Sequence, residues 1–403
     1  MRQYALVTAS YWALTLTDGA LRMLVVLHFH QLGYSPLEVA LLFLFYEFFG
    51  MVTNLFGGWL GARFGLAATL ISGLFLQVGA LAMLLVDASM LTVGYVMVAQ
   101  AFSGIAKDLT KMSAKSSVRL VAGDTESRLY RWVALLTGSK NALKGVGFFL
   151  GGALLAALGF QAAIATLAGG LAVVAVVTAL FSDRRLGKTT FKPKFQHLWS
   201  KSPQINRLSS ARLFLFGSRD VWFVVALPVF LQTQLSWSSV AVGTLLAAWV
   251  MGYGLVQTLA PAITRTRRAV HPTGLTAVYW GLALVGVPVG IGWALQAGLD
   301  AEAVVVGGLL LFGAVFAINS AVHSYLVVAF AGEDGVSLDV GYYYMSNAAG
   351  RLLGTVLSGW VFQSYGFAAC LFVSGALVAA ATVISLTLPR GAALAAGPPR
   401  AEQ

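Results

Sequence analysis

Residues 183–207 read Asp183-Arg-Arg-Leu-Gly-Lys188-Thr-Thr-Phe-Lys192-Pro-Lys194-Phe-Gln-His-Leu-Trp-Ser-Lys201-Ser-Pro-Gln-Ile-Asn-Arg207, the one long polar connection in a chain of 403 residues. On both sides of this basic stretch the sequence is strongly apolar. Of all residues 58% are hydrophobic and 10% are charged, and the mean hydropathy is +0.81. A soluble globular protein carries about 25% charged residues. The composition therefore predicts a polytopic membrane protein divided into two parts by this loop.

Crossing a bilayer takes about 20 apolar residues, and six windows on each side of the loop meet that length. The windows are residues 5–31, 37–60, 67–86, 90–112, 132–158, 161–182, 209–233, 238–262, 274–296, 302–327, 339–363 and 367–388. Short turns such as Leu158-Gly-Phe160 and Tyr365-Gly366 separate them. The windows predict an all-α membrane protein with 12 transmembrane helices in two six-helix halves.

The expected organisation is an N-terminal half (1–182), a basic central loop (183–207), a C-terminal half (208–389) and a disordered tail (390–403) rich in Ala, Pro and Gly. Six helices plus six around a basic loop resembles the layout of the major facilitator superfamily, whose halves are related repeats. Residues 58–65, Gly-Trp-Leu-Gly-Ala62-Arg63-Phe-Gly, also resemble the signature that follows the second helix of that superfamily. Ala62 stands where the signature has Asp.

Lysine and arginine asymmetry indicates the orientation in the membrane. The loops after helices 2, 4, 6 and 8 are basic, whereas the loops after the odd-numbered helices carry no Lys or Arg. The basic residues of these even-numbered loops are Arg63, Arg119, Arg128, Arg131, the central run, Arg265, Arg267 and Arg268. Both termini and the central loop are therefore expected in the cytoplasm, in the inner membrane of a bacterium. The first apolar run carries Asp18 and Arg22 and is too long for a signal peptide, which predicts a retained first helix.

Several function classes are disfavoured by the sequence. The net charge of +11 lies in short loops on one side and in helices, so it does not indicate a nucleic-acid partner. A single cysteine, Cys370, excludes an internal disulfide and a thiolate metal cluster. We find no phosphate-binding loop, nucleophile elbow or His-rich motif. We therefore expect no cofactor, no metal site and no enzyme activity, and the bilayer and a small solute as partners.

Lysines recur every fourth residue in two stretches, Lys107, Lys111 and Lys115 in the first and Lys140 and Lys144 in the second. This spacing places each set along one helix face. A charge at the centre of a bilayer costs about 2.5–3.5 kcal/mol, so such residues usually face a cavity and carry function. Two interpretations stay open: the first set extends to the headgroups from a helix end, or the lysines bind an anionic substrate.

Further charges fall inside the predicted helices 1 and 7. Asp18 and Arg22 lie four residues apart on one face and can neutralise each other, whereas the adjacent Arg219 and Asp220 point about 100° apart and are not expected to pair in that way. Because helices 1 and 7 are equivalent in the two halves, Arg22 and Arg219 are expected to face each other across a central cavity. This pattern resembles the organophosphate:phosphate antiporters of the superfamily, in which each half presents one arginine to a phosphate. Structural ion pairs are the alternative.

Arg351, with Asn347 one turn before it, adds a cation from helix 11, while Glu47 lies in helix 2 without a partner nearby in the sequence. Cations expected deep in the membrane outnumber the acids. The cations are Arg22, Lys107, Lys140, Lys144, Arg219 and Arg351, and the acids are Asp18, Glu47, Asp108 and Asp220. This surplus favours an anionic ligand, which we expect to contact these cations together with Lys111 and Asn347. Asp18 and Glu47 are the candidates for proton coupling.

Four runs are similar to the ArsJ family of organoarsenical efflux permeases, and the likeness extends over most of the chain. They are Tyr11-Trp-Ala-Leu-Thr-Leu-Thr-Asp18-Gly-Ala-Leu-Arg22, the first lysine stretch, Gly138-Ser-Lys140-Asn-Ala-Leu-Lys144-Gly, and Ala211-Arg-Leu-Phe-Leu-Phe-Gly-Ser-Arg219-Asp220. The resemblance implies export of 1-arseno-3-phosphoglycerate, which a glyceraldehyde-3-phosphate dehydrogenase makes when it uses arsenate. That dehydrogenase is thus the implied functional partner, and arsenate resistance the implied outcome.

The residues suit such a polyanion, because two oxyanion ends can meet two cationic clusters, one of arginines and one of lysines. Two alternatives remain open. A transporter of organophosphates or phosphate shares every feature read from the residues. A sensor that binds its ligand without transporting it belongs to a different class, and it would need a signalling partner at the central loop.

Overall fold

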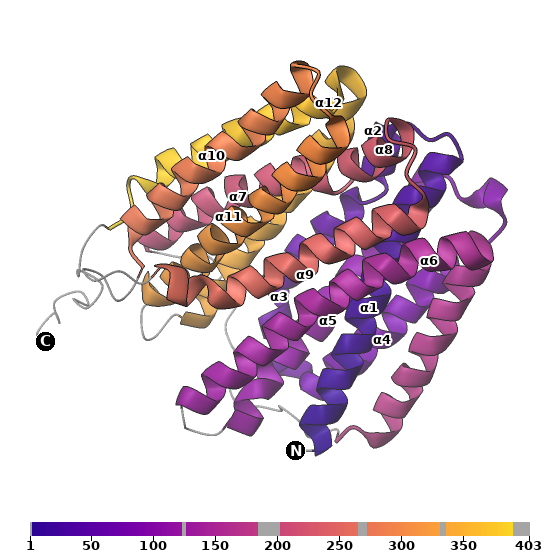
Figure 1. The fold of residues 1–403 in the computed structure, drawn as a ribbon. Helices are drawn as coiled ribbons and strands as arrows, with labels where there is room; N and C mark the ends of the chain where they lie inside the picture. The colour runs from indigo at the N-terminus through magenta and orange to yellow at the C-terminus, as the bar shows by residue number, and fades with distance from the viewer. Residues whose placement is uncertain (1, 123–125, 184–201, 265–271, 331–335, 390–403) are drawn as a thin grey trace, which may run out of the picture.

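The computed structural model describes residues 2–122, 126–183, 202–264, 272–330 and 336–389, and every regular element in these ranges is a helix (Figure 1). The helices of the N-terminal half are α1 (Arg2–Gln31), α2 (Pro36–Leu41), α3 (Leu44–Phe64), α4 (Leu66–Met83), the short 3-10 helix η1 (Ala88–Met90), α5 (Val93–Ala122) and α6 (Glu126–Phe181). Those of the C-terminal half are α7 (Pro203–Phe223), α8 (Ala226–Thr233), α9 (Ser239–Thr264), α10 (Gly274–Gln296), α11 (Ala301–Phe330) and α12 (Val336–Ser385). The predicted all-α fold is confirmed.

Two of these helices are too long for one crossing. α6 has 56 residues and α12 has 50, which at 1.5 Å per residue gives about 75–85 Å, against about 30 Å for the hydrocarbon core. Each is interrupted by a glycine with positive φ, Gly159 (φ 76°, ψ 176°) and Gly366 (φ 80°, ψ −177°). Glycine adopts this conformation without steric cost. The chain therefore turns back at the two glycines, where the sequence predicts a turn.

Within the described ranges, nine helical segments are long and apolar enough to cross a membrane, and the segments Ser139–Phe181 and Tyr342–Ser385 contain the two glycine breaks. Dividing these two segments at the glycines adds two crossings. The remaining crossing is α5, whose apolar character is interrupted by Lys107, Asp108 and Lys111. The twelve predicted crossings are thus present in the fold.

α7 begins within the range expected for the central loop. The side chain of Ser202 accepts a hydrogen bond from the backbone N–H of Ile205 (3.4 Å), and Pro203 occupies the first turn. Both features favour the start of a helix. The expectation that the loop extends to Arg207 is therefore wrong. The basic residues 184–201, the loop 265–271 and the tail 390–403, all used for the predicted orientation or organisation, lie outside the described ranges, as does the side chain of Arg63.

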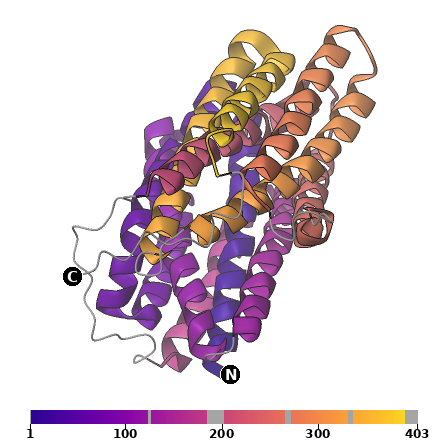
Figure 2. The ribbon, with the colours of Figure 1, turned by 90° about the vertical axis from the view of Figure 1, so that its left-hand side faces the viewer.

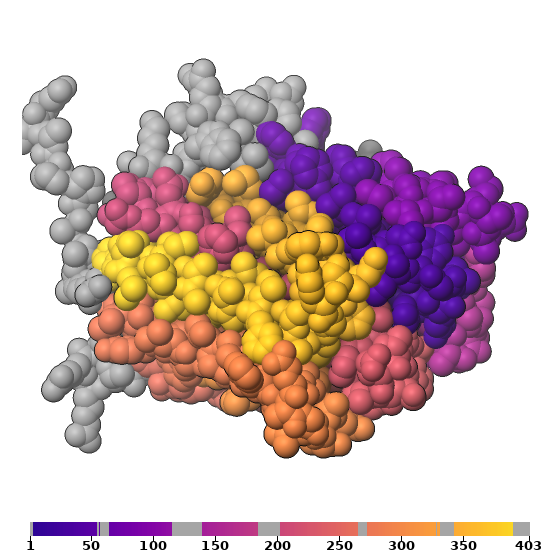
Figure 3. Space-filling model, turned by 90° about the horizontal axis from the view of Figure 1, so that it is seen from above, coloured from indigo at the N-terminus to yellow at the C-terminus, as the bar shows by residue number. Residues whose placement is uncertain are grey.

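The two halves lie side by side with a continuous apolar core (Figures 1 to 3). In the N-terminal half α1 packs against α6, and in the C-terminal half α7 packs against α12. Across the interface α6 packs on α9, and α2 and α3 pack on α12. Hydrogen bonds from Gln3 to Phe181 (3.0 Å) and from Arg207 to Thr387 (3.0 Å) join the first and last helices of each half at one end of the bundle. We call it the terminal end.

Glycines bring the halves into close contact near the opposite end. A Cβ atom on Gly152 of α6 would lie 2.5 Å from the carbonyl oxygen of Ser239 in α9, and one on Gly359 of α12 would lie 2.5 Å from the Cβ of Ala40 in α2. In addition, the Leu37 N–H donates to the side chain of Gln363 (3.1 Å). The halves therefore touch, backbone against backbone, at the end away from the termini.

Candidate functional site

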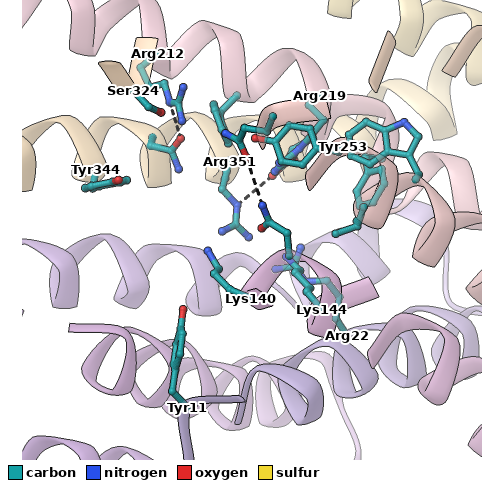
Figure 4. A pocket seen from close by; sticks show the side chains of 18 residues that line it. Tyr11, Arg22, Lys140, Lys144, Arg212, Arg219, Tyr253, Ser324, Tyr344 and Arg351 are labelled. Carbon is teal, nitrogen blue, oxygen red and sulfur yellow. Dashed lines mark hydrogen bonds and ion pairs between the residues drawn. The ribbon is translucent and has the colours of Figure 1, made fainter. Parts of the chain in front are cut away.

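Two adjoining cavities lie between the halves. The larger one, about 170 Å³, is lined by α1, α6, α7, α9, α11 and α12, and the smaller one, about 110 Å³, by α1, α3, α5, α6 and α12 (Figure 4). They share six lining residues, Tyr11, Lys140, Lys144, Tyr344, Asn347 and Arg351. We refer to the two together as the central cavity. The lining residues Tyr11, Lys111 and Gln257 lie in the parts of α1, α5 and α9 that are nearer the terminal end, so the cavity extends toward that end.

All ten residues selected from the sequence line this central cavity, although they come from six different helices. In the larger cavity are Arg22, Lys140, Lys144, Arg219, Asn347 and Arg351; Asp18, Glu47, Lys107 and Lys111 line the smaller one. In particular, Arg22 and Arg219, one from each half, line the same larger cavity. Their role in binding a substrate is a proposal that we develop below.

The arginines are joined by two buried carboxylates. Glu47, 1% exposed, accepts hydrogen bonds from Nη2 of Arg22 (2.6 Å) and from Nη2 of Arg351 (2.5 Å). Arg351 continues to Asp220, with 3.3 Å between its Nε and Oδ2, and Asp220 also pairs with Nη2 of Arg219 at 2.5 Å. This chain of five charged groups, here called the arginine chain, crosses from the N-terminal to the C-terminal half.

Two expectations about these pairs were wrong. Arg22 pairs with Glu47, whereas Asp18 accepts a hydrogen bond from the hydroxyl of Tyr46 at 2.5 Å. α3 packs close enough to supply both partners, and it displaces the pairing within α1. Arg219 does pair with Asp220, because its long side chain reaches back to a neighbour whose Cβ points elsewhere.

The lysines of α5 share one acid. Lys107 lies 3.7 Å from Oδ2 of Asp108 and 4.0 Å from the ring centre of Tyr46, while Lys111 contacts Oδ1 of Asp108 and donates to Oδ1 of Asn54 at 2.5 Å. Both lysines thus line the cavity and do not extend along the bilayer surface. The side chain of Lys115 lies outside the part that the structure describes.

Lys144 of α6 has a different environment. Its ammonium lies 5.5 Å from the ring centre of Phe148, and within the described ranges it has no carboxylate within ion-pair distance. The backbone around it is closely packed, because a Cβ on Gly19 of α1 would lie 2.8 Å from the carbonyl oxygen of Lys144. The charge of Lys144 is therefore held against α1 without a neutralising acid beside it.

The structure adds one cation that the sequence reasoning missed. Arg212 of α7 is 4% exposed and lines the larger cavity. It lies near the start of the predicted window 209–233, where a charge is easily attributed to the membrane surface. The available signal was its spacing of seven residues from Arg219, two helical turns, which places both on one face of α7.

Cations exceed acids around the central cavity. Among the described residues eight lysines and arginines line it, and four acids do so, Asp18, Glu47, Asp108 and Asp220. The eight cations are Arg22, Lys107, Lys111, Lys140, Lys144, Arg212, Arg219 and Arg351. Buried charges are stable only when they are compensated. A cavity with this surplus is suited to an anion.

Comparison with known proteins defines the family. Residues 7–332 match the family profile described as Major Facilitator Superfamily. A search of curated protein sequences found no match. Among solved structures, the fold is similar to a bacterial homologue of the iron transporter ferroportin in an inward-facing state (TM-score 0.71, 18% identity, covering 96% of this chain and 98% of that chain). It is also similar to a POT family transporter in complex with 5-aminolevulinic acid (TM-score 0.75, 13% identity, 96% and 95% covered). At these identities the likeness concerns the fold alone.

Proposed function

The chain belongs to the major facilitator superfamily and is a membrane transporter, and from this premise we propose that it exports an organoarsenical polyanion, 1-arseno-3-phosphoglycerate. The observation that carries the proposal is the surplus of buried and half-buried cations around a cavity between the two halves. The resemblance of the charged helices to organoarsenical permeases specifies the arsenic compound. Export of this compound would give resistance to arsenate.

The arginine chain supplies the chemistry for an oxyanion. A guanidinium group is planar and can bind two oxygens of a phosphate or arsenate group at once, and its charge strengthens each hydrogen bond. Arg22 and Arg351 reach the same carboxylate from opposite halves. An anion that replaces Glu47 between them would contact both halves. Substrate binding would thereby be coupled to the relative position of the halves.

Alternating access follows from the same geometry. The halves touch through Gly152 and Gly359 near the end away from the termini, whereas the cavity extends toward the terminal end. Rocking of one half against the other would separate the glycine contacts and close the cavity at the terminal end, as in transporters built from two repeats. The predicted cytoplasmic position of the termini in a bacterial inner membrane would make this the state that accepts substrate from the dehydrogenase inside the cell.

We further propose that proton entry drives the export. Glu47 holds the guanidinium groups of Arg22 and Arg351, and Asp18 is held by the Tyr46 hydroxyl. Entry of a proton in exchange for the anion requires that the two occupy the protein in turn, so the acid that carries the proton is ionised while the anion is bound. Glu47 is the first candidate for this proton. Asp18, one turn before Arg22 on α1, is the second candidate for this proton.

An organophosphate or phosphate transporter is the second candidate function, because the surplus of cations suits a phosphate ester equally well. The two functions differ in the solute that crosses the membrane, so one transport assay separates them. The third possibility, a sensor, differs from both because its ligand binds without crossing.

The test uses everted membrane vesicles that contain the protein and follows arsenic accumulation from arsenate. The complete mixture adds glyceraldehyde-3-phosphate dehydrogenase, glyceraldehyde 3-phosphate and NAD. Accumulation only in the complete mixture is the expected result. Accumulation from arsenate alone would identify an oxyanion carrier. Without accumulation in either case the organoarsenical proposal fails, and uptake of labelled 3-phosphoglycerate then separates a phosphate-ester transporter from a sensor.

Two variants connect this assay to the site. Arg22→Gln and Arg219→Gln each remove one cavity guanidinium and are expected to abolish accumulation at normal protein levels. Arg207→Gln is the matched control, because Arg207 also lies on α7 but is exposed and bonds to the backbone of Thr387, away from the cavity. Normal transport by both cavity variants would assign Arg22 and Arg219 a structural role.

A further inference from the structure

Arg212 is fixed in position by neutral groups. Its Nε donates to Oδ1 of Asn347 (3.0 Å), and its Nη1 donates to both the carbonyl and the hydroxyl of Ser320 (3.1 Å each). The guanidinium lies over the ring of Phe216, 4.0 Å from its centre. Among the described residues Nη2 has no acceptor, and no carboxylate lies within ion-pair distance.

This environment differs from that of the other cavity arginines. Arg22, Arg219 and Arg351 each contact Glu47 or Asp220. Arg212 is only 4% exposed, and among the described residues it has hydrogen-bond acceptors but no carboxylate beside it. A buried charge without a counter-charge is unfavourable, and the hydrogen bonds orient it without neutralising it. The protein thus holds a rigid, uncompensated cation at the wall of the cavity.

The position of Arg212 separates it from the Arg22 end of the arginine chain. Arg212 and Arg219 lie two turns apart on one face of α7, with Arg212 nearer the terminal end. Both guanidinium groups lie against the ring of Phe216, 4.0 Å and 4.9 Å from its centre. Figure 4 shows Arg212 at one edge of the cavity, apart from Arg22 and Lys144. Arg22, at the opposite end of the arginine chain, lies on α1 of the N-terminal half. A short molecule with an anionic group at each end can contact Arg22 and Arg212 at once.

We propose that Arg212 forms a second anion subsite, and that the protein therefore selects solutes with two separated oxyanion groups over solutes with one. This inference rests on the proposed anion transport and specifies its substrate class. The first group contacts the arginine chain, and the second accepts hydrogen bonds from Arg212. Asn347 then acts as a positioning residue, which holds Nε of Arg212 and is neutral so that the positive charge remains available.

The experiment measures binding of two stable phosphate esters to the purified full-length protein in detergent by isothermal titration calorimetry. Propane-1,3-diyl bisphosphate carries two oxyanion groups on three carbons, and glycerol 3-phosphate carries one. The wild-type protein is expected to bind the bisphosphate about 10-fold more tightly or better, the gain typical of one charge-assisted hydrogen-bonding group. Arg212→Gln should remove this preference and leave glycerol 3-phosphate binding within about threefold.

Asn347→Asp tests the charge without removing the guanidinium. The amide oxygen of Asn347 lies 3.0 Å from Nε of Arg212, and the new carboxylate would take its place. Because Asp and Asn have nearly the same shape, the change neutralises Arg212 with little change in packing. We expect Asn347→Asp to lose the preference for the bisphosphate as Arg212→Gln does. The variant that combines Asn347→Asp with Arg212→Gln should show no further loss. Arg212→Lys, which retains the charge, should keep part of the preference. Ligand-free melting temperatures identify any variant that does not fold, and Asn347→Asp then carries the test.

The possible results separate this inference from the proposed function. If the wild type binds both esters but without preference, or if both Arg212→Gln and Asn347→Asp retain the preference, the second subsite is refuted and anion transport is unaffected. Equal weakening of both esters by Arg212→Gln also refutes a separate subsite. If the wild-type protein binds neither ester, the proposed anion function itself fails.

Discussion

Replacement of Gly152 by alanine is expected to shift the protein toward the conformation in which the halves are apart at the end away from the termini. A Cβ at this position would lie 2.5 Å from the carbonyl oxygen of Ser239 and 3.2 Å from its carbonyl carbon. The facing Gly243 leaves no extra room, because its own Cβ would lie 2.9 Å from the carbonyl oxygen of Phe148. Backbone atoms within two helices cannot rotate away, so α6 and α9 must separate by about 1 Å to restore contacts of about 3.5 Å.

The magnitude follows from the cost of overpacking, which is about 1–3 kcal/mol for an added carbon in a tightly packed contact. The cost applies only to the conformation in which α6 and α9 touch. A difference of about 1–3 kcal/mol between two conformations changes their ratio by about 5- to 150-fold. The alanine also favours helix formation in both conformations equally, and this gain does not alter the ratio.

Cysteine accessibility measures the ratio. The only natural cysteine, Cys370, is fully buried, which keeps the labelling background low. A reporter cysteine at Val250, which lines the larger cavity, is labelled with a membrane-impermeant maleimide from the face opposite the termini. Gly152→Ala is expected to raise this rate by a factor within the range above. Gly170→Ala is the matched control, because its Cβ would have no neighbour within 4 Å.

An unchanged labelling rate in Gly152→Ala would refute the reasoning, because the contact would then not hold that end closed. Gly359→Ala offers an independent repeat at the other interface helix pair. Its added Cβ would lie 2.5 Å from the Cβ of Ala40 and 2.6 Å from the carbonyl oxygen of Pro36. Both variants should act in the same direction, since α2 and α12 close the same end as α6 and α9.

Three further predictions concern buried polar groups. Glu47→Gln leaves the guanidinium groups of Arg22 and Arg351 without the carboxylate that they share. Because breaking a buried ion pair costs about 3–5 kcal/mol, the melting temperature in detergent should fall clearly. Melting at the wild-type temperature would contradict the pairing. Asp18→Asn should allow transport that no longer depends on an imposed pH gradient, and transport that still follows the gradient would exclude coupling through Asp18. Gln77→Leu should leave the melting temperature unchanged or raise it, since neither polar atom of this buried amide has a partner among the described residues. A lower melting temperature would indicate a bound water in that place.

The number of crossings and the division into halves could be predicted from the sequence. Hydrophobic windows report how long each segment can remain in the bilayer, and this depends on local composition only. The glycine turns at Gly159 and Gly366 were found for the same reason, because positive φ favours glycine at the turn itself. The boundary of the central loop was less accurate, since a Ser-Pro pair starts α7 inside a polar stretch.

The candidate site could be predicted in part. Charged residues inside apolar windows are conspicuous. Nine of them, selected along the chain together with Asn347, meet at one cavity. Arg212 was missed because hydropathy near the end of a window does not distinguish a residue at the membrane surface from one turned inward. Its spacing from Arg219 was present in the sequence. That spacing indicates a cavity position only when it is known which face of α7 points inward.

Hydropathy and the spacing of charges are local properties, and from them the chain can be read as a twelve-helix membrane protein that holds a surplus of positive charge. Which cation meets which carboxylate is a different matter. Glu47 pairs with Arg22, 25 residues away, and with Arg351, 304 residues away. These contacts depend on how α1, α3 and α12 pack around the cavity, and charge along one helix carries no information about its neighbours in space. The uncompensated charge of Arg212 is visible for the same reason only in the folded chain.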